Sequence, residues 1–143
     1  MALLLSCLAA VLALPAGAEE PGEAKPAKES LVLELNRIEP LPEACRLYLL
    51  LRNEHAKAFE RLTLDLVFFD RDAIIDRRFS VEAGPIAARK TTLRQLDVPE
   101  LSCEELGSLL LNAVPSCGGT SVSQGDCIAL VVLKNRTDIT FFK

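Results

Sequence analysis

The chain has 143 residues, which suits one domain with a substantial core, and half of its residues are apolar. Its formal charge is −4, and no basic residues cluster into a stretch, which argues against nucleic acid as a partner because nucleic-acid binding needs a basic face. There is likewise no polybasic segment to hold the chain on an anionic membrane surface.

Residues 1–18 are almost purely apolar and end in the small-residue pattern Ala16-Gly17-Ala18. This pattern predicts a secretory signal peptide that is cleaved near Ala18, and therefore a periplasmic protein. The apolar run is too short to span a bilayer, so no integral span is expected in the mature chain. Two alternatives stay open: a retained N-terminal membrane anchor, and lipidation at Cys7, where the sequence loosely resembles a lipoprotein box.

Two further parts follow the signal peptide. Residues 19–30 are rich in Glu, Lys, Ala and Pro, a composition that cannot bury enough apolar surface to order itself and so predicts a flexible linker. Residues 31–143 are expected to form the folded domain, stapled by disulfide bonds.

Alternating apolar residues predict strands, because a half-buried strand turns every second side chain toward the core. The pattern is clearest in 31–36, 45–52 and 62–70, and the last two are expected to form the central pair of a sandwich. Further strands are predicted over 73–81, with Ile75, Arg77, Phe79 and Val81 in phase, and over 88–98, 128–133 and 138–142.

The segment that begins at Ser102 allows two interpretations. Ser102 and Glu105 match the capping-box pattern that opens helices, and leucines follow them. A helix of two or three turns is one possibility, and a short capped turn followed by a strand over 109–114 is the other. Gly107 disfavours a long helix, so we expect the turn and strand. The predicted fold is an all-β, immunoglobulin-like antiparallel β-sandwich of about seven to eight strands, with one short helical turn near 102–107.

The predicted mature chain contains four cysteines, an even number that predicts two disulfides in an exported protein. Three pairings are possible, and we favour Cys45–Cys103 and Cys117–Cys127. The second pair flanks a Gly/Ser-rich loop, where a short closed hairpin is easy to build. The cysteine spacing contains no C-x-x-C, which argues against a zinc site and against thiol-disulfide exchange chemistry.

Other candidate chemistry is sparse, so no enzyme activity, metal or cofactor is predicted. His55 is the only histidine and stands in a polar segment with no nucleophile motif nearby, so we expect a solvated loop residue. Asp70, Asp72 and Asp76 superficially suggest a calcium loop but lack its central glycine and distal glutamate. A turn with solvated charges is the better interpretation.

Two basic pairs stand out in an acidic chain. Arg77-Arg78 and Arg89-Lys90 fall in consecutive predicted strands. If they meet on one sheet face, they form a patch for an anion or a partner protein. The alternative is ordinary surface charge.

The order of these features resembles an uncharacterised family of small exported bacterial proteins. It begins with Cys45 and LYLLLRN, continues with LTLDLVFFD and Gly84-Pro85, and ends with Cys103 and LGSLLLN. The chain also looks like the FxLYD type of extracytoplasmic domain, although that signature itself is absent. The resemblance implies an immunoglobulin-like sandwich and implies no activity or catalytic residues.

Together these features predict an exported, non-enzymatic module that binds another protein, expected to be an envelope protein. Two alternatives are a small-ligand carrier or enzyme with a pocket between the sheets, and a membrane-tethered structural protein with an uncleaved N-terminus. Fold alone does not decide between them.

Overall fold

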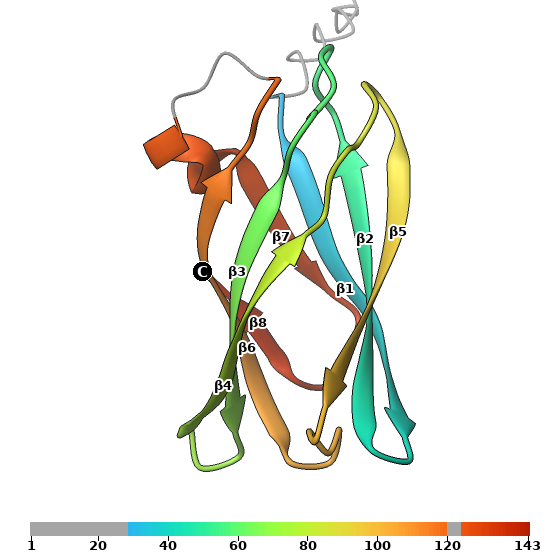
Figure 1. Ribbon diagram of the computed structural model, residues 1–143, viewed down its shortest axis with the longest axis vertical. Coiled ribbons are helices and arrows are strands. Elements are labelled where there is room, and N and C mark those ends of the chain that lie inside the picture. Colours follow the sequence, from blue (N-terminus) through green and yellow to red (C-terminus); the bar gives the residue numbers. More distant parts are fainter. Residues whose placement is uncertain (1–28, 120–123) are drawn as a thin grey trace, which may run out of the picture.

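The computed structural model describes residues 29–119 and 124–143. Within these residues, eight strands form two four-stranded sheets that lie face to face (Figure 1). The first sheet has the order β5-β2-β1-β7 and the second the order β4-β3-β6-β8. The strands are β1 (Leu31–Leu41), β2 (Ala44–Asn53), β3 (Thr63–Asp70), β4 (Ile75–Glu82), β5 (Thr91–Pro99), β6 (Leu106–Ser116), β7 (Val131–Asn135) and β8 (Thr140–Phe142).

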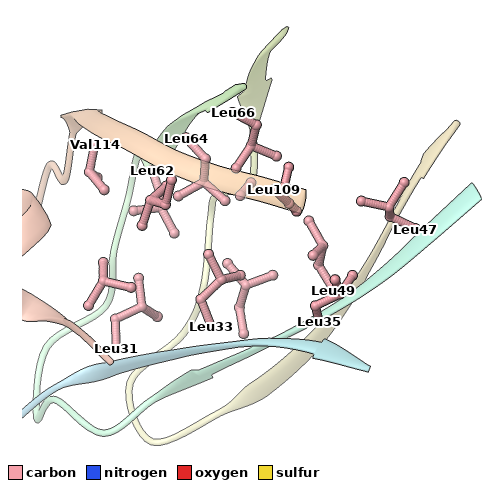
Figure 2. Close-up of a cluster of buried hydrophobic side chains, with 14 of the residues drawn as sticks. Leu31, Leu33, Leu35, Leu47, Leu49, Leu62, Leu64, Leu66, Leu109 and Val114 are labelled. Atoms are coloured by element: carbon pink, nitrogen blue, oxygen red, sulfur yellow. The ribbon is translucent and has the colours of Figure 1, made fainter. Parts of the chain in front are cut away.

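The core lies between the sheets and consists mainly of leucines. Leucine on its own favours helices, but here it recurs at every second residue, and that period places it on one face of a strand. Leucines of β1 and β2 face those of β3 and β6 across the gap (Figure 2). The two strands expected to form the central pair, β2 and β3, lie in opposite sheets and do not pair with each other. Their inward side chains are all fully buried: Cys45, Leu47, Leu49, Leu51, Leu64, Leu66 and Phe68.

A β-bulge at Asn36 lets β1 continue beyond its predicted end. The pairing of β1 with β2 shifts register between Leu35 and Arg37, so Asn36 is an extra residue in the ladder. Such a bulge reverses which side chains face the core. Ile38 therefore packs against the core, whereas Arg37 is exposed. The predicted strand 31–36 is confirmed, but β1 runs on through Pro40 to Leu41.

The strands in the middle of the chain agree closely with those predicted from the alternation of apolar residues. The strands predicted over 62–70 and 73–81 are confirmed as β3 and β4, which pair antiparallel as a hairpin. The strand predicted over 88–98 is confirmed as β5, which begins three residues later, at Thr91, and ends at Pro99. Between β4 and β5 the chain crosses from the second sheet to the first through a cis Gly84-Pro85 peptide bond.

The segment after β5 is a turn and then a strand, as we expected. The amides of Glu105 and Leu106 donate to the carbonyl of Ser102 at 3.1 and 3.2 Å, and the Ser102 hydroxyl accepts from the Glu104 amide at 3.2 Å. The capping side chain therefore closes a turn, and β6 starts directly at Leu106. Gly107 is required there, because a Cβ would lie 2.3 Å from the Asp70 carbonyl oxygen.

The C-terminal part differs from the prediction in two ways. The expected strand 128–133 is wrong in its first half, where a 3-10 helix, η1 (Gln124–Leu130), precedes β7. The antiparallel prediction holds for four strand pairs, but β7 runs parallel to β1 and β8 runs parallel to β6. The C-terminal strand predicted over 138–142 is confirmed as β8, at the edge of its sheet.

The N-terminal predictions reach beyond this structure. The signal peptide, Cys7 and most of the linker lie outside the described residues. Ser30, expected as the last linker residue, is buried, and its hydroxyl donates to a Glu54 carboxylate oxygen at 2.7 Å. In the part of the chain that the structure describes, no helix is both long and apolar enough to cross a membrane.

Candidate functional site

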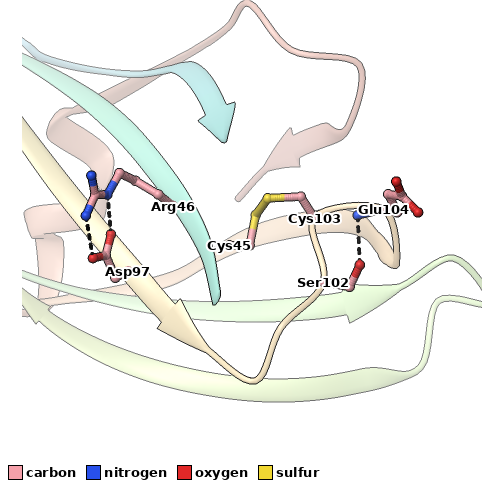
Figure 3. The surroundings of a disulfide bond; sticks show 6 residues. All are labelled: Cys45, Arg46, Asp97, Ser102, Cys103 and Glu104. Atoms are coloured by element: carbon pink, nitrogen blue, oxygen red, sulfur yellow. Dashed lines mark hydrogen bonds and ion pairs between the residues drawn. A yellow bond between two sulfur atoms is a disulfide. The ribbon is translucent and has the colours of Figure 1, made fainter. Parts of the chain in front are cut away.

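The first disulfide, Cys45–Cys103, ties β2 to the turn before β6, as predicted (Figure 3). The two Cα atoms lie 4.9 Å apart and are separated by 58 positions in sequence. Beside it, Arg46 of β2 binds Asp97 of β5 through two hydrogen bonds. The bridge joins the two sheets, because β2 and β6 belong to different ones.

The second disulfide, Cys117–Cys127, also has the predicted pairing, with Cα atoms 5.8 Å apart. It links the residue after β6 to η1, so the expected short hairpin is not formed by these cysteines. The neighbouring Gly118 carbonyl accepts the Glu60 amide at 2.8 Å. The bridge therefore fixes η1 at the end of the sandwich where β3 begins, and residues 120–123 of the Gly/Ser-rich loop lie outside the described residues.

The two basic pairs do not form one patch. Arg77 of β4 donates to the carbonyls of Pro99 and Glu100, beyond one end of β5. Arg89 donates to the Glu54 carbonyl, before the other end of β5. The nine residues between those ends span about 30 Å at the usual strand rise. Each pair is therefore a separate local feature.

Arg78 lies on the opposite face of β4 from Arg77 and belongs to a polar cluster on the outer face of its sheet. Its guanidinium group donates two hydrogen bonds of 2.7 Å to Asp65 of β3, and Asn112 of β6 donates a third at 2.6 Å. The Asp65 side chain is only 6% exposed. The Arg78 hydrogen bonds, with help from Asn112, hold the pKa of the Asp65 carboxyl below its usual value despite burial, which raises it.

Lys90 takes part in a second polar cluster, at the end of β2. Its carbonyl accepts the Asn53 amide at 2.8 Å. The Asn53 side chain is buried, donates to the carbonyls of Lys57 at 2.9 Å and Ala87 at 3.1 Å, and accepts the His55 amide at 2.8 Å. One side chain thus holds two loops together, which is a structural role.

His55 is buried, so the prediction of a solvated loop residue is wrong. Its ring packs edge-on against Phe59, with the centroids 5.4 Å apart. Its Nδ1 lies 3.5 Å from a Glu29 carboxylate oxygen. The reason is the Asn53 cluster, which folds the polar segment back onto the end of the core.

Asp70 closes the β3–β4 turn with its own side chain. The Asp70 carboxylate accepts the amides of Asp72 at 3.0 Å and Ile74 at 2.8 Å. Across residues 29–119 and 124–143, no group of three or more His, Cys, Asp or Glu side chains is arranged to hold a metal ion. The turn thus uses its carboxylate to satisfy backbone amides.

The loops at the end of the sandwich that carries the β3–β4 turn meet around hollows in the surface. One, of about 310 Å³, lies between the β3–β4 turn and the β5–β6 loop. A second, also about 310 Å³, lies between the β5–β6 loop and the β1–β2 turn. We call this end of the sandwich the loop end. The residues that line the first hollow are Asp70, Arg71, Asp72, Asp76, Glu100, Leu101 and Glu105.

Ile74 and Ile75 project from the loop end, and each is 62% exposed. Ile75 is in phase with Phe79 and Val81, which pack against the core, and was predicted to share their environment. It does not, because the register between β3 and β4 shifts at Asp76: Arg77 is opposite the buried Phe68, whereas Ile75 is opposite Phe69 and so faces outward. The sequence signal for this exposed apolar surface is two adjacent large apolar residues within a charged turn. The alternating pattern masked this signal, because it assigned Ile75 to the core face of a strand.

Arg94 was also missed by sequence reasoning. Its side chain points inward from β5 and donates to the carbonyls of Ala83 at 3.0 Å and Pro85 at 3.2 Å. With Arg77 at the other end of β5, it closes the side of the sandwich between the two edge strands. No sequence motif predicts such a hydrogen bond, since its acceptors are backbone atoms.

Within the described residues, these features define an eight-stranded β-sandwich whose polar clusters are structural and whose two most exposed large apolar side chains, Ile74 and Ile75, lie at the loop end. No family model, no curated protein and no solved structure matches the chain.

Proposed function

We propose that this chain is an exported, non-enzymatic module that binds another protein through its loop end. The observation that carries the proposal is the exposed pair Ile74 and Ile75 at the tip of the β3–β4 hairpin. Covering a large apolar side chain favours binding by on the order of 1 kcal/mol or more for each residue. Protein interfaces concentrate their binding energy in a few such residues.

The disulfides support the exported location. Two bridges with the predicted pairings are compatible with an oxidising compartment, and periplasmic export through a signal peptide cleaved near Ala18 is the proposal that fits them. The sandwich is likewise compatible with the resemblance to FxLYD-type exported domains. An envelope protein is the partner that this location favours.

The packing supports binding on the surface rather than between the sheets. Side chains from both sheets fill the core and are almost wholly buried. The two hollows at the loop end lie between loops at the surface; the first is lined mainly by charged residues, and the second by apolar and acidic residues. A carrier of small apolar ligands would need a pocket between the sheets.

Co-purification from envelope extracts of the producing cells tests the proposal. The tagged protein is compared with the double variant Ile74→Ser, Ile75→Ser. We expect one discrete envelope protein to co-purify with the unaltered chain and to be lost with the variant, because the apolar contact is removed.

The control replaces two other exposed apolar residues, Leu93→Ser and Val132→Ser, which are 48% and 46% exposed on the other sheet. This variant should retain the partner. Absence of any co-purifying protein, or equal loss with both variants, contradicts a binding role for the loop end.

A further inference from the structure

The loop end carries more negative charge than the chain as a whole. The loops 41–44, 70–77 and 99–106 meet there, as the two hollows between them show. They hold seven acidic and two basic residues and so have a formal charge of −5, against −4 for the whole chain. The acidic residues are Glu43, Asp70, Asp72, Asp76, Glu100, Glu104 and Glu105.

The two basic residues at the loop end are engaged mainly with the backbone. Arg71 donates to the Glu104 carbonyl, and Arg77 donates to the carbonyls of Pro99 and Glu100 and pairs with the adjacent Asp76. These bonds hold the loops in place but leave most of the carboxylates uncompensated. Among the described residues, six of these carboxylates pair with no basic side chain: Glu43, Asp70, Asp72, Glu100, Glu104 and Glu105.

Carboxylates on the sheet faces, by contrast, form ion pairs with arginines. Asp65 pairs with Arg78, Asp97 with Arg46 and Glu34 with Arg136. Each of these bonds neutralises a negative charge within the molecule itself. The loop end is therefore a region where negative charge stays available to a partner, and the exposed Ile74 and Ile75 belong to the same β3–β4 segment as Asp70, Asp72 and Asp76.

We propose that the loop end recognises a basic protein segment, in which Lys or Arg residues flank a large apolar side chain that covers Ile74 and Ile75. This inference rests on the proposed function and names the chemistry of the partner. Apolar contact at the centre and opposite charges around it is the usual arrangement of a specific interface. The charge of the loop end would repel nucleic acids and anionic lipid surfaces.

Selection from a random peptide library displayed on phage tests the inference. The intact protein is the bait, and peptides are selected at low ionic strength. We expect the enriched peptides to carry Lys or Arg beside large apolar residues. The dissociation constant of the best peptide should increase about tenfold with the triple variant Glu100→Gln, Glu104→Gln, Glu105→Gln, and should also increase with added salt, because opposite charges are removed or screened.

The charge control is Glu60→Gln, which lies beside Gly118 at the other end of the sandwich and should leave peptide affinity unchanged. The inference is overturned if no peptide is enriched, if the enriched peptides are acidic or uncharged, or if the triple variant binds as the unaltered protein does. If the envelope partner still depends on Ile74 and Ile75 in that case, the binding function stands and only the basic chemistry fails.

Discussion

Asp65 and Asp97 show how burial changes the value of the same interaction. Both accept two hydrogen bonds from an arginine on a neighbouring strand, and both have a lowered carboxyl pKa because of those bonds. The Asp65 side chain is almost fully covered, whereas that of Asp97 is about half exposed. Water competes for the exposed pair, so its contribution to folding is smaller.

Replacing Asp65 with Asn should lower the free energy of unfolding at pH 7 by about 1–3 kcal/mol, since a buried, charge-assisted pair is lost. A carboxyl with a lowered pKa stabilises the fold above its unfolded pKa near 4, and that contribution disappears as the pH falls through the lowered value. Urea unfolding between pH 7 and pH 3 should therefore show the difference from the unaltered protein shrinking below pH 4.

The matched control for this measurement is Asp97→Asn, which should cost less stability at pH 7. Equal losses for the two variants, or an Asp65→Asn difference that persists unchanged at pH 3, would show that burial does not set the strength of these pairs.

At the residue scale the sequence was informative where side chains alternate and uninformative where polar side chains bind backbone. The alternation placed Leu47 and Leu64 correctly, because period 2 is a direct consequence of strand geometry. It gave no sign of the roles of Asn53 or Arg94, whose acceptors are carbonyls from distant loops. Such bonds depend on the tertiary structure, which no local pattern records.

At the scale of elements, the two disulfides close loops of different length. Cys45–Cys103 spans 58 positions and joins the sheets, whereas Cys117–Cys127 spans 10 and fixes η1. A longer loop restricts the unfolded chain more, which corresponds to about 4 kcal/mol for the first bridge and about 3 kcal/mol for the second.

Removing each bridge by paired Cys→Ala substitution should therefore destabilise the protein, and the loss should be larger for Cys45 and Cys103. Denaturant unfolding under non-reducing conditions measures both. A larger loss for the Cys117 and Cys127 pair would instead place the main contribution in the packing of η1 against β6.

There are physical reasons why the sequence did not predict some of the elements and their pairing. A short apolar run such as Ile128–Leu133 fits a strand and a buried helical turn equally well, and the bridge at Cys127 selects the turn for its first half. The parallel pairing of β7 and β8 depends on where the chain crosses between sheets. Periodicity identifies strands but does not identify their neighbours.

At the scale of the whole molecule, charge and exposed apolar surface are distributed unevenly. The faces of both sheets carry paired charges, and the loop end carries uncompensated carboxylates together with the exposed Ile74 and Ile75. Composition alone showed that the chain is acidic, so the two basic pairs stood out as a candidate patch. The fold separates these pairs by the length of β5. The candidate binding surface at the loop end can be recognised only from the fold, which brings its loops together.

The central claim, that the loop end contacts a partner protein, is tested most directly by site-specific photo-crosslinking in the producing cells. A photoreactive phenylalanine derivative is placed at Ile75 in one strain and at Val132, an exposed residue on the other sheet, in a second. We predict one discrete crosslinked protein from position 75 and none from position 132. No adduct from position 75, or the same adducts from both positions, would contradict the claim.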